Sequence, residues 1–457
     1  MNIKKTLLAV SIGGFASLVQ AEPVSQAFVP TTHAKNSQAD ATGWVEGQTL
    51  GGTTRNWYAN ELGMRETRFS YNKDGTPTDT RRRINWVQGT IVNYSSGFTQ
   101  GTVGISAELA LYNAIALDRS RHDMAGGSNR TLTENDGDAV GQWSKLGLGN
   151  IKARVSNTVL TAGRQTLDTP MVASIGNRAL PSSFQGVALH SAEFNNLSFD
   201  AGSFDRVSPR SEQSLSKFTS EYGNRSFTAD HVNTAGFNYQ PLESLETSFY
   251  ATQAQDLWNQ YYLGATHTMG DKAVFGLTTS LNYYKTKNTG KSQLGSIDND
   301  TYSLAFTGTH NAHSVTLAYQ EVGGNEYFDY LHETNGIFLA NSLLSDFNGP
   351  NEKSLQIAYA LDMSGYGVPG LKLSIYQARG WGIDGTHYKG TGYGDLAALD
   401  GEHHYEYGIG STYTVQNGPL KNSTLRATYS THRASQQQID GNLNELRLVT
   451  TVPFTIL

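Results

Sequence analysis

The chain ends on ELRLVTTVPFTIL, residues 445–457, in which polar and apolar residues alternate almost to the last position. A period of two is typical of a β-strand with one polar and one apolar face. A strand leaves a row of unpaired backbone groups unless another strand pairs with its free edge. The rest of the sequence therefore has to supply a partner for this last strand.

Alternating runs of the same kind recur from residue 53 to the end of the chain. We expect strands at 53–60, 84–94, 102–111, 149–155, 159–165, 185–193, 197–203, 235–241, 246–253, 260–268, 273–284, 301–309, 313–321, 353–362, 371–379, 405–415, 423–431 and 444–457. No segment shows a strong helical period over three turns. The chain is therefore predicted to be all-β.

The connections between these strands are alternately short and mostly long. Short turns are expected at 94–101, 156–158, 194–196, 241–244, 268–273, 309–313, 365–370 and 416–422, and the segments between them are mostly long. This pattern is typical of a transmembrane antiparallel β-barrel with short periplasmic turns and long extracellular loops. Only helices and closed barrels satisfy the backbone in lipid, so the first strand, 53–60, should pair with the last.

The composition fits a secreted barrel and excludes several other classes. The chain has no cysteine, which excludes a disulfide framework and Cys-based zinc sites. A formal net charge of −6 argues against a nucleic-acid partner. Residues 1–21 fit a secretory signal peptide rather than a buried helix, with Lys4 and Lys5 ahead of an apolar stretch. Residues 22–50 are predicted to be a flexible lead-in, and 51–457 the barrel.

Five basic residues alternate with apolar neighbours: Arg55, Lys152, Arg154, Arg426 and Arg447. A charged side chain on the lipid face costs about 2–4 kcal/mol at the bilayer midplane, so we expect all five to face the lumen. On the last strand, Leu446, Leu448, Val452, Phe454 and Ile456 would then face lipid. Two interpretations stay open: a charged wall that keeps the lumen wet, or a basic track that guides anions.

Aromatic residues near strand ends, among them Trp86, Tyr94, Tyr261, Tyr262, Tyr429 and Phe454, fit interfacial girdles as well as ordinary surface positions. GYGVPG at 365–370 is interpreted as a turn because an alternating run follows it. HHYE at 403–406 is a conceivable metal motif, but without further ligands in view a solvated loop is favoured. No catalytic constellation stands out, so neither an enzyme, nor a metal, nor a cofactor is predicted.

Several stretches resemble the OprD family of outer-membrane carboxylate channels. They are GFTQGTVG (97–104), YSLAFTGTHNAHSVTLAYQ (302–320), IFLANSLLSDFNGPNEKS (337–354), YGVPGL (366–371), IDGT (383–386), VQNGPLKN (415–422) and NELRL (444–448). The resemblance runs in order from about Thr53 to the end. It implies a monomeric barrel of about eighteen strands in the outer membrane of a Gram-negative bacterium. Inward-folded loops would form a narrow constriction, with a ladder of basic side chains leading through it.

The resemblance also assigns positions in this chain. The ladder keeps Arg55, Arg426 and Arg447, whereas two ladder positions are Thr412 and Thr428. The constriction loop keeps Ser342 and Asp346 and follows a strand that carries Tyr319, while Leu344 stands near the place of a tyrosine. Arg178, in GNRALP, matches the basic residue of the other inward loop.

The expected function is passive, substrate-preferring diffusion of small carboxylate-bearing solutes, such as amino acids, small peptides or aromatic acids. Partners besides these anionic or zwitterionic solutes would be outer-membrane lipid and lipopolysaccharide. The alternative is a general or oligosaccharide-preferring porin of the same architecture.

Overall fold

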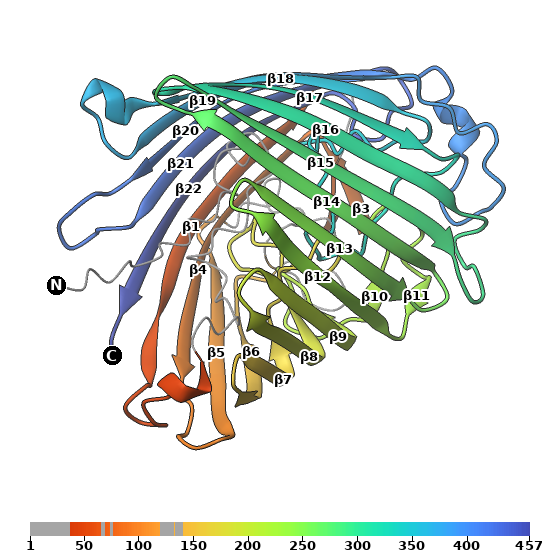
Figure 1. Ribbon diagram of the computed structural model, residues 1–457. Helices are drawn as coiled ribbons and strands as arrows, with labels where there is room; N and C mark the ends of the chain where they lie inside the picture. The colour runs from red at the N-terminus through yellow and green to blue at the C-terminus, as the bar shows by residue number, and fades with distance from the viewer. Residues whose placement is uncertain (1–36, 65–68, 74–75, 119–131, 133–139) are drawn as a thin grey trace.

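The last strand of the chain closes a barrel by pairing with the first. The computed structural model describes residues 37–64, 69–73, 76–118, 132 and 140–457. Within them, eighteen antiparallel strands form one closed sheet. β22 (Leu443–Thr455) pairs with β1 (Thr49–Gly63), and Figure 1 shows β1 between β22 and β4 (Arg82–Ser95). The register joins Thr53 to Pro453 and Asn60 to Leu446, as closure requires.

The remaining barrel strands follow in chain order. They are β5 (Gly104–Ala116), β6 (Gln142–Val155), β7 (Thr158–Gln165), β8 (Ser183–Phe194), β9 (Leu197–Ser208), β12 (Val232–Leu242), β13 (Leu245–Ala254), β14 (Trp258–Asp271), β15 (Phe275–Asn288), β16 (Asp298–His310), β17 (His313–Gly323), β18 (Lys353–Asp362), β19 (Leu371–Trp381), β20 (His404–Thr414) and β21 (Thr424–Ala434). Each of the eighteen predicted strands corresponds to one strand of the barrel, with boundaries that differ by up to seven residues.

The elements outside the barrel wall are small. β2 (Phe69–Lys73) pairs with β3 (Thr76–Thr80), and β10 (Phe218–Thr219) pairs with β11 (Thr228–Ala229). The 3₁₀ helices of the described residues are η3 (Gln38–Asp40), η4 (Met363–Tyr366) and η5 (Leu396–Leu399). Among the described residues, no helix is long and apolar enough to cross a membrane. The turn predicted at 365–370 lies between β18 and β19, where η4 ends on Gly367 in the left-handed region (φ 81°).

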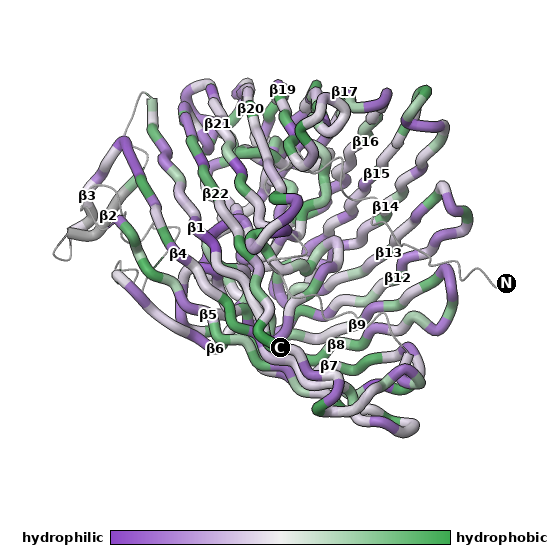
Figure 2. The backbone as a smooth tube through the Cα atoms, turned by 90° about the vertical axis from the view of Figure 1, so that its left-hand side faces the viewer, coloured by the Kyte–Doolittle hydropathy of each residue, from purple (hydrophilic) through white to green (hydrophobic). Residues whose placement is uncertain are grey.

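Polar and apolar residues are sorted to opposite faces of the wall. Large apolar side chains that are exposed on the outer face include Leu109, Leu111, Ile151, Leu317, Ile357, Ile375, Ile409 and Leu448. Figure 2 shows hydrophobic and hydrophilic residues alternating along many strands. Inside, charged groups are paired, as in Arg83 and Glu61, whose Nε and Oε2 lie 2.7 Å apart. The wall is therefore apolar outside and polar inside, as a barrel in lipid requires.

One aromatic residue of the predicted girdles points the other way. Tyr261 is 42% exposed on the outer face, whereas the neighbouring Tyr262 is only 4% exposed. The Tyr262 hydroxyl donates to Asn282 Oδ1 at 2.7 Å inside the barrel. Successive side chains of a strand face opposite sides, so the two tyrosines cannot share one girdle.

Residues 37–48, which belong to the predicted flexible lead-in, pack against the barrel. Gln38 is buried, its backbone N–H donates to Ser156 O (2.8 Å), and its side-chain amide donates to Thr99 O (2.8 Å) and Gly101 O (3.1 Å). The segment thus joins two turns at one barrel mouth, although its sequence has no period that would indicate this contact. The predicted signal peptide, 1–21, lies outside the described residues and stays a prediction.

Candidate functional site in the barrel lumen

Three long loops fold into the barrel and hold one another there. They are the connections 166–182, 209–231 and 324–352. An isolated bridge joins Ser174 to Thr334. The backbone N–H of Glu221 donates to Tyr330 O at 2.9 Å, and that of His332 donates to Thr219 O at 2.9 Å. The inward-folded constriction loops implied by the resemblance are therefore present.

The loop 324–352 turns inward because its apolar residues have a place to be buried there. Phe328 and Leu339 are fully buried, and they join Tyr262 and Tyr284 of the wall in one core cluster. The Tyr284 hydroxyl also accepts the backbone N–H of Phe338 at 2.9 Å. Burying such side chains stabilises the loop in the lumen by about 1.5–3 kcal/mol each.

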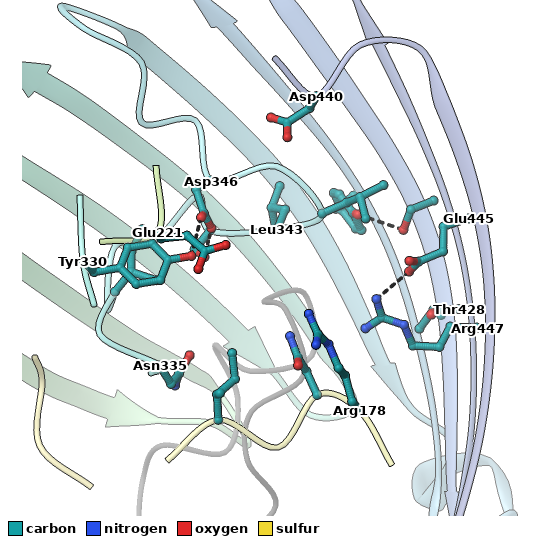
Figure 3. Close-up of a pocket in the computed structure, with 18 of the residues that line it drawn as sticks. Arg178, Glu221, Tyr330, Asn335, Leu343, Asp346, Thr428, Asp440, Glu445 and Arg447 are labelled. Atoms are coloured by element: carbon teal, nitrogen blue, oxygen red, sulfur yellow. Dashed lines mark hydrogen bonds and ion pairs between the residues drawn. The ribbon is translucent and has the colours of Figure 1, made fainter. Parts of the chain in front are cut away.

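A cavity of about 380 Å³ remains between these loops and the strands β19 to β22. Figure 3 shows Arg447, Glu445 and Thr428 on the wall, facing Asp346, Tyr330 and Glu221 across the open space. The predicted residues Arg178, Ser342, Asp346, Arg426 and Arg447 all line this cavity, as do Thr428 and Leu344. Five of the nine predicted site residues are thus brought together.

The wall side of the cavity carries two of the predicted guanidinium groups. Arg426 and Arg447 lie on neighbouring strands, and Thr428 stands directly opposite Arg447. Arg447 Nη2 lies 2.7 Å from Glu445 Oε1, so this charge is partly offset by a neighbour on its own strand. Thr412 pairs with Arg426. Both threonines therefore lie beside the two guanidinium groups on the neighbouring strand.

On the inward loops, Arg178 belongs to a buried ion-pair network. Arg210 Nε and Nη2 donate to the two carboxylate oxygens of Glu333 at 2.8 and 3.1 Å. Arg178 Nη1 lies 3.9 Å from the same carboxylate. Burial opposes ionisation of Glu333, but Arg210, His332 and Arg178 outweigh it and hold its pKa well below the usual range. The network fixes the loops on which Arg178 and Glu333 lie, while Arg178 still reaches the cavity.

The loop side of the cavity presents the carboxylate of Asp346. Three hydroxyl groups donate to it, from Ser342 at 2.5 Å, Tyr222 at 2.7 Å and Tyr330 at 2.8 Å. Burial raises the pKa of Asp346, and the three donors oppose this rise. An acidic group is therefore held in a fixed place across the cavity from the wall arginines.

Three other predicted basic residues face inward but lie away from the cavity. Arg55 donates to Gly176 O, and Lys152 Nζ lies 3.0 Å from Glu108 Oε2. Arg154 Nε donates to Gln38 Oε1 at 3.0 Å, and its guanidinium lies 3.9 Å from the centre of the Phe98 ring. The predicted inward direction of all five basic strand residues holds, but these three do not continue the row of Arg426 and Arg447 into the cavity.

The resemblance places Tyr319 at the constriction, but this residue lies on the outer face. It shares its side of β17 with the exposed residues Val315 and Leu317, and its hydroxyl donates to Glu321 Oε2 at 2.8 Å. The two-residue period of TLAYQ places Tyr319 with Leu317. The position carried over from the family therefore does not put the Tyr319 side chain in the lumen.

Other cavity residues were not found from the sequence. They include Arg210, Glu221, Tyr222, Tyr330, Tyr376, Asp440 and Glu445. Tyr376 and Glu445 lie on strands, where the two-residue period puts them on the inner face, but each has only one apolar neighbour in the sequence. The others lie on loops, where no period indicates a direction.

The solvated loop favoured for HHYE, 403–406, is wrong for two of its residues. His404 and Glu406 are buried, at 1% and 0% exposure. Glu406 accepts the backbone N–H groups of Leu344 (3.1 Å) and Ser345 (3.0 Å), and so helps to hold the constriction loop. β20 begins at His404, so both residues belong to a strand and not to a loop. They are two positions apart, and both side chains face inward.

Comparison with known proteins agrees with this architecture. Residues 42–456 match the family model described as outer membrane porin, OprD family. Porin D of Pseudomonas aeruginosa is 36% identical over 451 residues, which cover 95% of both chains. The crystal structure of P. aeruginosa OccD3 (OpdP) is 50% identical, with a TM-score of 0.81 over 92% of this chain and 95% of that chain. The structure of P. aeruginosa OpdK with vanillate is 25% identical, with a TM-score of 0.76 over 91% and 100%.

Proposed function

Because the chain belongs to the OprD family of outer-membrane porins, we propose that it passes small carboxylate-bearing solutes, and among them prefers zwitterionic ones. As a porin of this family it is a channel of the Gram-negative outer membrane and not an enzyme. Amino acids, small peptides and aromatic amino acids have the required groups. Simple aromatic acids, which lack the ammonium group, would pass less readily.

The observation that carries this proposal is that the cavity presents guanidinium groups on its wall and a carboxylate on the loop opposite. Arg426 and Arg447 line one side of it and Asp346 lies on the loop opposite. Guanidinium groups bind carboxylates with two parallel hydrogen bonds and stay charged at any relevant pH. A solute with a carboxylate at one end and an ammonium group at the other can satisfy both sides at once. A solute with two carboxylates would place one of them near Asp346.

The relatives support the carboxylate part of the proposal. The vanillate in the OpdK structure is an aromatic acid with one carboxylate. In this chain Glu445 offsets part of the charge of Arg447, and the residue opposite Arg447 on the neighbouring strand is the uncharged Thr428. The preference for anions should therefore be weaker here than along an uninterrupted basic ladder.

One observation favours the second candidate, a general or oligosaccharide-preferring porin. Three tyrosines, Tyr222, Tyr330 and Tyr376, line the same cavity, and aromatic rings of this kind can stack on sugars. Their hydroxyl groups, however, donate to the carboxylates of Asp346 and Glu406. Block of the single-channel current by an oligosaccharide, with no block by amino acids, would favour this second function.

The proposal is tested by replacing both wall arginines in one protein, Arg426→Ala with Arg447→Ala, and measuring the swelling of proteoliposomes. Uptake of a zwitterionic amino acid should fall about tenfold relative to a neutral sugar of similar size, equivalent to about 1.4 kcal/mol. Arg379→Ala is the matched control, because Arg379 is exposed on the outer face of β19. An unchanged ratio of amino acid to sugar uptake would contradict the role of the arginines.

We also propose that the barrel acts as a monomer, with its apolar outer band in contact with lipid and its polar rim in contact with lipopolysaccharide. The rim has hydrogen-bonded tyrosine–carboxylate pairs on the outer face. Tyr302 and Tyr319 donate to Glu321 (2.9 and 2.8 Å), and Tyr283 donates to Asp300 (2.5 Å). Native mass spectrometry of the protein released from membranes would reveal both the number of chains and any retained lipopolysaccharide.

A further inference from the structure

A cluster of two histidines and one aspartate lies behind the constriction loop. His404 and His432 lie on the paired strands β20 and β21, where His432 is opposite Glu406 and thus diagonal to His404, and Asp440 lies on the connection that leads to β22. His404 Nδ1 and His432 Nε2 are 2.7 Å apart. The candidate ligand atoms of the three residues all lie within 4.8 Å of one another. Both imidazoles are at most 1% exposed, so the cluster is part of the interior.

The outer nitrogen of each imidazole has an acceptor that fixes the ring. His432 Nδ1 lies 2.5 Å from Gly441 O, and because a carbonyl only accepts, the proton is on Nδ1 and the lone pair of Nε2 points inward. His404 Nε2 lies 2.5 Å from the carboxylate of Glu352. In metal sites, histidine ligands donate their other N–H to a carboxylate or a backbone carbonyl in this way. The two outer nitrogens are thus held as in a metal site, and the two inner nitrogens face each other.

We propose that His404 Nδ1, His432 Nε2 and the Asp440 carboxylate bind a divalent transition-metal ion such as Zn²⁺ or Cu²⁺. Imidazole suits both ions, and a carboxylate is a common third ligand. The metal takes the place of the proton between the two nitrogens. Because Zn–N bonds are about 2.0–2.1 Å long, the nitrogens separate to about 3.3 Å in a tetrahedral site. Two nitrogens and one carboxylate leave a fourth position for water.

Asp440 has the geometry of the third ligand. Ser345 Oγ (2.6 Å) and Gln438 Nε2 (3.1 Å) both donate to Oδ2. Oδ1 accepts no hydrogen bond within the described part of the chain, so it is available to a cation. Asp440 also lines the lumen cavity, and Figure 3 shows it at the edge of that space. An ion that enters the channel can therefore reach the cluster.

The same residues hold the constriction loop, so the site would fasten that loop. Ser345 donates to Asp440, and the Phe347 ring stacks on His404 with 4.3 Å between ring centres and 18° between planes. Both residues belong to the loop 324–352. A metal that pulls His404 and Asp440 together acts directly on the contacts of that loop.

The test uses the full-length protein without a histidine tag, stripped with a chelator and folded in detergent. Titration calorimetry with Zn²⁺ should reveal about one equivalent bound per chain, with proton release, because metal binding displaces protons from its ligands. His432→Gln and Asp440→Asn should each weaken Zn²⁺ binding more than tenfold. Glu352→Gln should weaken it by about 10–100-fold, because the carboxylate that accepts from His404 Nε2 and orients this ring is lost. His403→Gln, at an exposed neighbouring histidine, is the control and should bind as the unmodified protein does.

Electron paramagnetic resonance of the unmodified protein with Cu²⁺ gives an independent measurement if a variant fails to fold. The spectrum should contain hyperfine coupling to two imidazole nitrogens. Failure of the folded unmodified protein to bind Zn²⁺ in the titration would overturn the proposal. So would a Zn²⁺ affinity that stays unchanged in folded His432→Gln and Asp440→Asn, or a Cu²⁺ spectrum without nitrogen coupling.

Discussion

Among single residues, Asp346 determines the character of the loop side of the cavity. Its carboxylate accepts hydroxyl groups from three residues, Ser342, Tyr222 and Tyr330. These donors are neutral, so they fix the position of the group without cancelling its charge. Because burial raises the pKa of Asp346, this charge is lost on acidification at a higher pH than for an exposed aspartate.

Replacing Asp346 with asparagine should make the channel less selective for cations. The change removes the negative charge and nearly keeps the shape of the side chain. Reversal potentials in a KCl gradient measure the effect, which should be a shift towards anion selectivity. Tyr330→Phe is the matched control, because it removes one hydrogen bond but leaves the carboxylate. Equal shifts in both variants would show that loop position, and not charge, sets the selectivity.

Tyr319→Phe, by contrast, should leave transport unchanged. The hydroxyl group lies on the outer face and donates to Glu321, so it does not reach the solute path. Single-channel conductance and amino acid uptake of this variant should equal those of the unmodified protein. Removal of an exposed hydrogen bond is expected to cost about 0.5–1.5 kcal/mol of stability at most. Reduced uptake would mean that the Tyr319 hydroxyl contributes to the solute path after all.

Among the elements, the inward loops depend on ion pairs between segments far apart in sequence. Glu221 of one loop pairs with His332 of another. Burial opposes the ionisation of Glu221, but the hydrogen bond and charge of His332 lower its pKa to about 2. A carboxylate with a lowered pKa stabilises the folded loops fully above the ordinary value near 4.5 and loses this contribution as the pH falls towards 2.

The loops should therefore become accessible to protease in acid. Pepsin is active in that range, so the rate of cleavage within 209–231 can be measured from pH 5 to pH 2. It should rise steeply below pH 4.5, while the barrel strands stay intact. In Glu221→Gln the ion pair is lost at every pH, so cleavage should be faster at pH 5 and depend less on acid. A pH profile that is the same in both proteins would contradict the role of this pair.

The strands could be predicted from the sequence, but the residues that line the cavity could be predicted only in part. The reason is physical. Lipid imposes a period of two on every strand, so the inward direction of Arg426 and Arg447 follows from the apolar residues on either side of each. Arg55 also faces inward, although its neighbours Thr54 and Asn56 are polar. Loops have no such period. Arg210 and Glu333 pair although they are 123 positions apart in the sequence. The residues next to each of them do not indicate which residue it pairs with. The loop residues Ser342, Asp346 and Arg178 were identified only through the family resemblance.

For the molecule as a whole, closure depends on β22. The pairs from Gly51–Thr455 to Gly63–Leu443 join β1 to the other end of the sheet along nearly its whole length. A chain that ends at residue 442 should leave the edges of β1 and β21 unpaired, which lipid does not tolerate. It should lose the folded, heat-modifiable band on an SDS gel completely.

Removal of Leu457 alone is the control for this truncation. Leu457 lies beyond β22 and exchanges backbone hydrogen bonds only with Leu50 (3.1 and 2.9 Å). The shortened protein should still migrate as a folded barrel when it is not boiled. A folded band from the chain that ends at 442 would mean that β1 and β21 can close the sheet without β22.

The attachment of Gln38 has a practical consequence for labelling. Its side chain and backbone bind the turns at residues 99–101 and Ser156, so the chain is anchored at the barrel mouth before the first strand begins. A fluorophore or affinity handle joined directly ahead of Ser37 would emerge beside that mouth, on the periplasmic side. Such a reporter would sit where solutes leave the channel, at the opposite end of the barrel from the long external loops.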